Sequence, residues 1–214
     1  MKKTYAVFGL GRYGMAVASE LEARGAEVVA IDIDPAAVEE AASSLTVCKC
    51  ADITDRKVAE QLGIANVDTV IIAMANSFEA SVMATMLCKE LGVPTVIAKC
   101  SNELHRQILR KVGADRVVFP ENDSGIRLAR NLLTAGFIDM MELSGKVSLV
   151  EMEVRGEWAG KSLAELNLRK RYAMNVVALR HGNAVSTAID PNAPLQKEQT
   201  LIVIAETDRL ERLK

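Results

Sequence analysis

The amino-acid sequence predicts an α/β fold, with a Rossmann-like, doubly wound parallel sheet of six strands followed by a small α+β domain. Three observations lead to this prediction. Up to residue 120, short apolar runs alternate with amphipathic stretches, which is the pattern of repeated βαβ units. A Gly-x-Gly-x-x-Gly turn at residues 9–14 joins the first apolar run to the first amphipathic stretch. After Pro120 the alternation stops, so a second unit is expected there.

Six apolar runs are expected to form the parallel sheet, because several are apolar at nearly every position, as strands covered on both faces require. Helix-start signals lie between them. Asp34-Pro35 is typical of an N-cap followed by proline at the first helical position, and residues 76–79 fit a capping box ending at Glu79. The expected strands span residues 4–9, 27–32, 46–50, 68–74, 95–99 and 116–119.

The remaining chain is expected to connect and complete a two-domain protein. Residues 1–121 are predicted to bind nucleotide, 122–143 to form one long connecting helix, and 144–214 to form the α+β domain, with Ser144-Gly145-Lys146 at the boundary. A unit of about 70 residues is marginal alone, so pairing with another copy is expected. Its expected strands are 147–154, 175–180, 184–187 and 200–205, and its expected helices are 162–166, with Ser162 and Glu165 as a capping box, and 208–214.

Composition excludes several classes of protein. The net charge is −2, from 26 basic and 28 acidic residues, so no nucleic-acid partner is indicated. No uncharged stretch reaches the ~18–20 residues of a membrane span, and the start of the chain lacks the apolar region of a signal peptide. A cytoplasmic protein is therefore expected. The spacing Cys48-x-Cys50 is not that of a zinc site, so reduced, buried thiols are expected.

The glycine turn, residues 9–14, predicts a nucleotide site. Gly9 permits the tight turn, Gly11 lets the backbone approach a phosphate, and Gly14 lets the helix pack close to the strand. The N-terminus of that helix attracts the anion. Asp32, 18 residues after Gly14, is placed to accept hydrogen bonds from ribose hydroxyls, which disfavours NADP. Alternatively, Asp32 only caps the turn at Asp34.

Two further residues refine the choice of ligand. Asp52 ends the third run, where such folds contact adenine, although it could instead cap a helix starting near Thr54. Arg12 stands where a dinucleotide fold often has a small residue, and a guanidinium there can neutralise a terminal phosphate. It favours ATP or ADP over NAD, unless it is a solvated surface arginine. The predicted cofactor-binding residues are Gly9, Gly11, Arg12, Tyr13, Gly14, Asp32, Ile33, Asp34, Asp52, Ile53, Met74, Ala75, Lys99, His105 and Glu121.

The sequence favours a binding module over an enzyme. His105 and His181 are the only histidines, no constellation for hydride or acyl transfer is present, and there is no P-loop motif. The alternative is a small NAD(P)-dependent oxidoreductase, supported by the glycine turn with Asp32. A redox-sensing, repressor-like Rossmann protein is a third interpretation, disfavoured because no basic DNA-reading helix is present.

Four segments carry a resemblance to a known family. They are VFGLGRYG at 7–14, AID at 30–32, LRKVGADRVVFPE at 109–121 and LRKRYAMNVVAL at 168–179. Through them the N-terminal unit resembles the RCK (regulator of conductance of potassium) domain, and the C-terminal unit resembles its usual companion. The whole chain resembles the Ktr-type cytoplasmic gating subunit of bacterial potassium transporters. A single copy of the unit favours this over the double-unit Trk arrangement.

The resemblance implies an octameric ring of dimers under a membrane potassium-translocating subunit. In the family, ATP and ADP, and in some members NAD(H), bind the N-terminal crevice and switch the ring between shapes. By resemblance, Arg12 would reach the terminal phosphate, Asp32 would hold the ribose, and Asp52 and Ile53 would lie near adenine. Glu121 would help place a cation, Mg, Ca or Na, at the dimer interface. Without the family, Glu121 is an acid at a helix start.

Some relatives also bind a second messenger, cyclic di-AMP, in the C-terminal unit. The matching positions are Arg169, Asn175 and Val176, within a basic cluster suited to phosphates. The same cluster could equally be a solvated surface.

Overall fold

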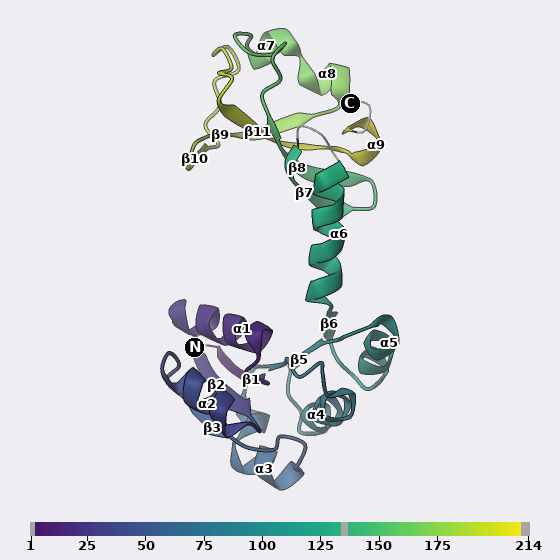
Figure 1. The fold of residues 1–214 in the computed structure, drawn as a ribbon. Coiled ribbons are helices and arrows are strands. Elements are labelled where there is room, and N and C mark those ends of the chain that lie inside the picture. Colours follow the sequence, from purple (N-terminus) through teal and green to yellow (C-terminus); the bar gives the residue numbers. More distant parts are fainter. Residues whose placement is uncertain (1–2, 134–136, 211–214) are drawn as a thin grey trace. The chain divides into compact units, whose positions relative to one another are not determined.

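The computed structural model describes residues 3–133 and 137–210, and its ribbon is drawn in Figure 1. The chain divides into two compact units, Met1–Pro120 and Glu121–Lys214. Each unit has its own sheet and its own hydrophobic core. The two are therefore described one after the other.

The first unit is built on the predicted parallel sheet. Its strand order is β3-β2-β1-β4-β5-β6, and every pairing is parallel. The chain winds outward from β1 to β3, then crosses back to β4 beside β1, so the switch point lies between β1 and β4. The predicted strands are confirmed to within two residues at each end. They are β1 (Thr4–Phe8), β2 (Glu27–Asp32), β3 (Cys48–Cys50), β4 (Thr69–Ile72), β5 (Thr95–Lys99) and β6 (Arg116–Val118).

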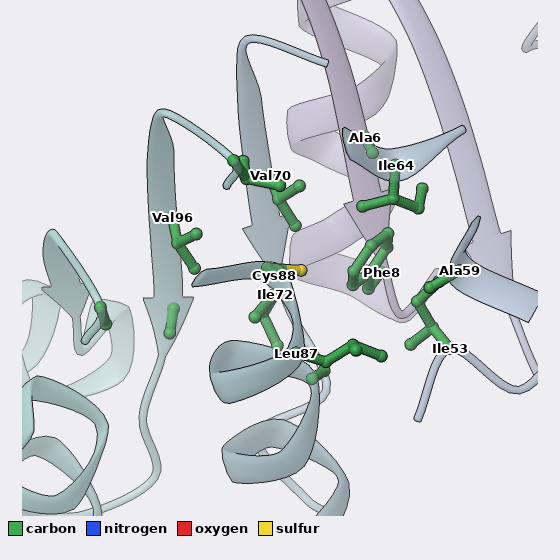
Figure 2. Packing of buried hydrophobic residues seen from close by; sticks show 14 of the residues in the cluster. Ala6, Phe8, Ile53, Ala59, Ile64, Val70, Ile72, Leu87, Cys88 and Val96 are labelled. Atoms are coloured by element: carbon green, nitrogen blue, oxygen red, sulfur yellow. The ribbon is translucent and has the colours of Figure 1, made fainter. Parts of the chain in front are cut away.

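Helices cover both faces of this sheet, because its central strands are apolar on both sides. Val7 and Ile71 pack in a cluster with residues of α1 and α2, whereas Phe8 and Ile72 point to the other face and pack with residues of α3 and α4. Figure 2 shows this second cluster gathered around Phe8. The helices are α1 (Arg12–Ala23), α2 (Pro35–Ala42), α3 (Arg56–Gln61), η1 (Ile64–Asn66), α4 (Phe78–Glu90) and α5 (Glu103–Lys111).

Of the two helix starts predicted in this unit, one is confirmed and the other is not. Asp34 is the N-cap of α2, its side chain accepts a hydrogen bond from the Ala36 N–H at 3.0 Å, and Pro35 follows at the first position, as predicted. The capping box expected over residues 76–79 is wrong. Helix α4 begins at Phe78 after Ser77, which makes no side-chain cap bond. The Ser77 N–H instead donates a hydrogen bond to the Met74 carbonyl at 3.1 Å. The N-cap is therefore Ser77, one residue later than the expected Asn76.

The second unit is an antiparallel sheet of order β10-β9-β11-β8-β7. One face packs on a core that includes Trp158, Met174 and Leu201. The capping box predicted at Ser162 and Glu165 is present at the start of α7. The elements are α6 (Pro120–Leu133), β7 (Phe137–Ser144), β8 (Val147–Glu153), α7 (Leu163–Leu166), α8 (Leu168–Tyr172), β9 (Asn175–His181), β10 (Ala184–Ser186), β11 (Gln199–Glu206) and α9 (Thr207–Leu210).

The single helix expected over residues 122–143 is wrong. Helix α6 ends at Leu133, and the chain returns as strand β7, which pairs antiparallel with β8. Gly145-Lys146 forms the two-residue connection between these strands, so the expected domain boundary is a hairpin turn. Pairing with β8 overrides the helical spacing of the apolar residues, because it satisfies the backbone groups of the whole segment. Of the terminal helix expected over 208–214, residues 211–214 lie outside the described residues.

Candidate functional site

The glycine turn is fixed by the backbone packing around it. Gly9 has φ +90°, a conformation that favours glycine, and a Cβ on it would lie 3.1 Å from the Met74 nitrogen. A Cβ on Gly14 would lie 1.8 Å from the Gly9 carbonyl oxygen, so α1 sits directly on the turn. These two glycines are required by the fold itself.

Gly11 is different, because nothing in the protein requires it. Its φ of −65° suits any residue, and a Cβ there would meet no atom within 4 Å. Gly11 is the N-cap of α1 and has no side chain with which to cap the helix. The first turn that follows it contains no acidic residue. The first N–H groups of a helix lack intrahelical acceptors and carry a positive partial charge. The turn therefore fits an approaching phosphate.

Asp32 ties the glycine turn to the end of β2. Its carboxylate accepts a hydrogen bond from the Leu10 N–H at 2.6 Å and another from the Asp34 N–H at 2.9 Å. The alternative prediction, that Asp32 caps the turn at Asp34, is therefore confirmed by the structure. Each carboxylate oxygen keeps a second lone pair, so both contacts are compatible with accepting a ribose hydroxyl, which stays a prediction.

A cavity of about 240 Å³ lies at the carboxyl ends of the strands, beside the switch point. We call it the carboxyl-edge cavity. It is smaller than the ~300–1,000 Å³ typical of drug-sized ligands, so it matches part of a nucleotide. Six predicted residues line it: Gly9, Asp32, Ile33, Asp52, Ile53 and Met74.

The two isoleucines contribute differently to this cavity. Ile33 is 66% exposed and stands at its rim. Ile53 is 4% exposed and packs with Phe8 and Ala59 in the core, as Figure 2 shows, so it presents only an edge to the cavity.

Asp52 does not cap a helix. Its carboxylate accepts hydrogen bonds from the Thr54 N–H at 2.9 Å and the Thr54 hydroxyl at 2.6 Å. These bonds, first that of the hydroxyl, lower the pKa of Asp52 below its ordinary value. The N-cap of α3 is instead Asp55, which accepts a bond from the Lys57 N–H at 2.8 Å. Asp52 is therefore an exposed, ionised residue at the cavity, held by a local turn.

Three more predicted residues stand at the start of α1 or close to it. Arg12 is exposed, and among the described residues it has no ion-pair partner. The Lys99 Nζ, at the end of β5, lies 5.5 Å from the centre of the Tyr13 ring. Two cationic side chains, those of Arg12 and Lys99, thus lie at or close to the glycine turn.

Two other predicted residues of the first unit, Asp34 and Ala75, do not line the carboxyl-edge cavity, and Glu121 belongs to the second unit. Asp34 caps α2 and does not line the carboxyl-edge cavity. Ala75 is buried at 5% exposure. Glu121 is an exposed residue in the first turn of α6, within the second unit.

His105 was predicted to bind a cofactor, and in the structure its side chain is fully buried. The Ser81 hydroxyl donates to the Phe78 carbonyl at 2.8 Å, so it accepts from the His105 Nε2 at 2.8 Å. The His105 Nδ1 then accepts from the Ser101 N–H at 3.3 Å. Burial lowers the pKa of His105. The neutral ring joins α4 to the start of α5 and has a structural role.

Sequence reasoning missed several residues that line the cavity. Ser77 and Ala80, from the start of α4, and Ala51 and Thr54, after β3, are among them. The rule that selected Met74, namely that segments following parallel strands meet at one edge of the sheet, would also have selected these four.

Two hollows in the second unit bring together the predicted second-messenger residues. One, of about 310 Å³, and another, of about 320 Å³, share Arg169 and Asn175, and Val176 lines the second. Between α8 and β9, Ala173 has φ +52°, a left-handed conformation unusual for a residue with a Cβ. Within residues 3–133 and 137–210, no group of three or more potential ligands gathers to hold a metal ion.

The same described ranges contain no helix that is long and apolar enough to cross a membrane. The four cysteines are free thiols, of which Cys88 and Cys100 are buried as expected, whereas Cys50 is exposed because it lies on the edge strand β3.

Comparison with known proteins gives a consistent result over the whole chain. The TrkA-N domain model matches residues 5–120 and the TrkA-C domain model matches residues 149–214. The chain is 38% identical to Ktr system potassium uptake protein C of Bacillus subtilis, over 100% of this chain and 97% of the relative. It is 34% identical to Ktr system potassium uptake protein A of Vibrio alginolyticus, over 97% of this chain and 94% of the relative.

Among solved structures, the GsuK RCK domain shares the fold at 19% identity, with a TM-score of 0.69, over all of this chain and 47% of that one. The GsuK channel matches with a TM-score of 0.73 over 39% of its length. The resemblance inferred from the four sequence segments is thereby confirmed. With a TrkA-N domain followed by a TrkA-C domain, the chain belongs to the family of Ktr system potassium uptake proteins.

Proposed function

We propose that the chain is a nucleotide-sensing gating subunit that regulates a membrane potassium transporter or channel. Its full-length relatives are named as potassium uptake proteins. GsuK structures of the same fold were solved with NAD and with ADP bound. ATP and ADP are the proposed ligands here, with base and ribose in the carboxyl-edge cavity and phosphates on the glycine turn.

The observation that carries the proposal is the position of Arg12. Its guanidinium has no acidic partner among the described residues. Arg12 is also the first residue of α1, the helix that follows the glycine turn directly. A ligand shifts a conformational equilibrium only through different affinities for the two states. Because ATP alone supplies a third phosphate, Arg12 is the proposed discriminator between ATP and ADP.

Calorimetric titration of Arg12→Ala with ATP and ADP tests this role. We expect ATP binding to weaken about tenfold or more and ADP binding to weaken less, since a hydrogen bond between charged groups contributes ~1.5–3 kcal/mol. Arg24→Ala is the matched control, because Arg24 follows the opposite end of the same helix and pairs with Glu20. Equal losses for both nucleotides would refute the discriminating role.

We propose that the bound nucleotide is not chemically transformed. The relatives are uptake proteins, and His105 is fully buried. An oxidoreductase would need an accessible proton-transfer group near the nicotinamide. Stabilisation by NADPH alone in a thermal-shift panel of ATP, ADP, NADH and NADPH would favour the oxidoreductase instead.

The proposed assembly is a homo-oligomer, dimers forming an octameric ring, in the cytoplasm beneath a membrane potassium-translocating subunit. Helix α6 supports association, because Ile126, Leu128 and Leu132 are 45%, 60% and 77% exposed. Glu121, on the same helix, is the proposed ligand of an interface cation, Mg, Ca or Na. Glu121 is the only ligand proposed from each chain, so binding of the cation also depends on the nucleotide phosphates and the second copy. A mass of eight chains in solution would support the ring, and a stable monomer would contradict it.

We also propose roles for the two units. The first unit binds the nucleotide, and the second unit, which carries α6 and the antiparallel sheet, regulates. The hollows lined by Arg169, Asn175 and Val176 are the proposed site for cyclic di-AMP. Both combine the cationic Arg169, the amide of Asn175 and apolar walls, which suit the phosphates and bases of a cyclic dinucleotide, and Glu206 also lines the first hollow.

A further inference from the structure

A second cavity lies at the opposite edge of the parallel sheet from the glycine turn. We call it the amino-edge cavity. Its volume is about 570 Å³, against about 240 Å³ for the carboxyl-edge cavity, and it falls within the ~300–1,000 Å³ typical of small-molecule sites. It is formed where β1 and β2 begin, whereas the carboxyl-edge cavity is formed where β2 ends. The two cavities share no lining residue.

Most of the wall of the amino-edge cavity is apolar, and four valines from three parts of the fold contribute to it. Val28 and Val29 come from β2, Val47 precedes β3, and Val67 follows η1. Val47 is 37% exposed although it is apolar, so part of this wall faces solvent. The other lining residues are Thr4, Tyr5, Glu22, Ala26, Glu27, Thr46, Leu62, Gly63 and Asn66.

Among the residues that the structure describes, the charged ones that line this cavity are two acids, Glu22 and Glu27. The Glu22 carboxylate accepts hydrogen bonds from the Thr46 N–H and hydroxyl, which hold it in place. Glu27 is exposed at the start of β2. Asp68 accepts a hydrogen bond from the Thr4 N–H at 2.8 Å and interacts electrostatically with Lys3, so those two charges offset each other.

The end of α1 adds to this negative potential. Helix α1 ends at Ala23, next to lining residues Glu22 and Ala26, with no basic residue in its last turn. The carboxyl end of a helix carries about half a negative charge. Arg24, just beyond it, pairs with Glu20. The two carboxylates and the carboxyl end of α1 thus favour binding of a cation, whereas the valine side chains favour binding of an apolar group.

We propose that the amino-edge cavity binds a small organic ammonium compound with an apolar body. The ammonium group lies between Glu22 and Glu27, and the apolar body contacts the valine side chains. Nucleotides and other anions are disfavoured there, because no basic side chain within residues 3–133 lines the cavity. This ligand site is separate from the proposed nucleotide function and does not depend on it.

The test is a titration of the full chain with phenethylammonium, followed by NMR of its ¹³C-labelled valine methyl groups. A ligand of this size is expected to bind with a Kd on the order of 1 mM. The methyl signals of the four lining valines should shift, and those of Val150 and Val203, in the core of the second unit, should not. The anion 3-phenylpropionate, which has a similar apolar body, should cause no comparable shift.

Variants make the test specific. Glu27→Gln should weaken phenethylammonium binding about two- to fivefold, as for loss of one exposed charge pair, whereas Glu39→Gln, an equal charge change on α2 away from the cavity, should not. Val47→Trp should fill the cavity and abolish binding. ADP affinity, measured on the same samples, should stay unchanged, which separates this site from the nucleotide site. The proposal would be overturned by any of three results. The lining valines show no shift with phenethylammonium, 3-phenylpropionate binds as tightly as phenethylammonium, or Glu27→Gln and Glu39→Gln bind phenethylammonium equally.

Discussion

Gly14→Ala tests how tightly α1 is packed on the glycine turn. The new Cβ would lie 1.8 Å from the Gly9 carbonyl oxygen, whereas real Cβ contacts essentially never fall below 3.0 Å. Helix α1 must therefore retreat by at least 1.2 Å, the difference between these distances. The obstacle is backbone, so no side chain can rotate away. Overpacking of this kind costs about 1–3 kcal/mol, which corresponds to a loss of roughly 2–12 °C in Tm for a chain of this size.

Gly11→Ala is the matched variant, because its Cβ would meet nothing within 4 Å. Its φ of −65° is open to alanine, so the Tm should change by only a few degrees, as for loss of a favourable N-cap residue. ADP binding, however, should weaken at least tenfold, or about 1.4 kcal/mol, because the methyl group occupies the space that the phosphate needs. Calorimetry measures both quantities. The single tryptophan, Trp158, reports only the second unit.

The two variants therefore separate packing from binding. Gly14→Ala should lose stability and affinity together, whereas Gly11→Ala should lose affinity alone. If Gly11→Ala binds ADP as tightly as the parent chain, the phosphate does not approach this turn. If Gly14→Ala melts with the parent chain, the packing argument is wrong.

Three further predictions concern other parts of the chain. Because burial lowers the pKa of His105 from 6.5, the unfolded chain takes up this proton first. The free energy of unfolding should therefore be retained above pH 6.5 and decline as the pH falls below it, and denaturation at several pH values should show a smaller decline in His105→Gln. Ala173→Gly should stabilise the second unit by about 1 kcal/mol, measured by the fluorescence of its tryptophan during unfolding, because the left-handed φ of +52° strains alanine. Arg169→Ala should weaken cyclic di-AMP binding at least fivefold in a calorimetric titration. Arg171→Ala, at an exposed residue that lines neither hollow, should leave it unchanged.

Local signals account for most of the fold that the sequence predicted. Asp34-Pro35 and the pair Ser162 and Glu165 specify their helix starts within four residues, and both are found as expected. Strand β7 was missed because its structure depends on pairing with β8. A segment with helical spacing can form a strand when its backbone groups find partners outside the segment.

The candidate site likewise contains residues that the sequence could predict and a residue whose environment it could not. The lining of the carboxyl-edge cavity follows from parallel strands that end at one edge, so Asp32, Asp52 and Met74 were predictable. The burial of His105 was not, because Ser81, its partner, lies 24 residues earlier on another helix. No local pattern distinguishes such a histidine from an exposed one.

The edges of the two sheets have a consequence for solubility. Both edge strands of the parallel sheet, β3 and β6, are only three residues long, and each carries a basic side chain, Lys49 or Arg116. Short, charged edges resist pairing with strands of other molecules, and therefore aggregation. In the other sheet the eight-residue edge strand β7 carries Asp139 and Glu142, which contact Asn131 and Arg130 of α6. Polar contacts with a helix thus occupy the longer edge, where unwanted strand addition would otherwise begin.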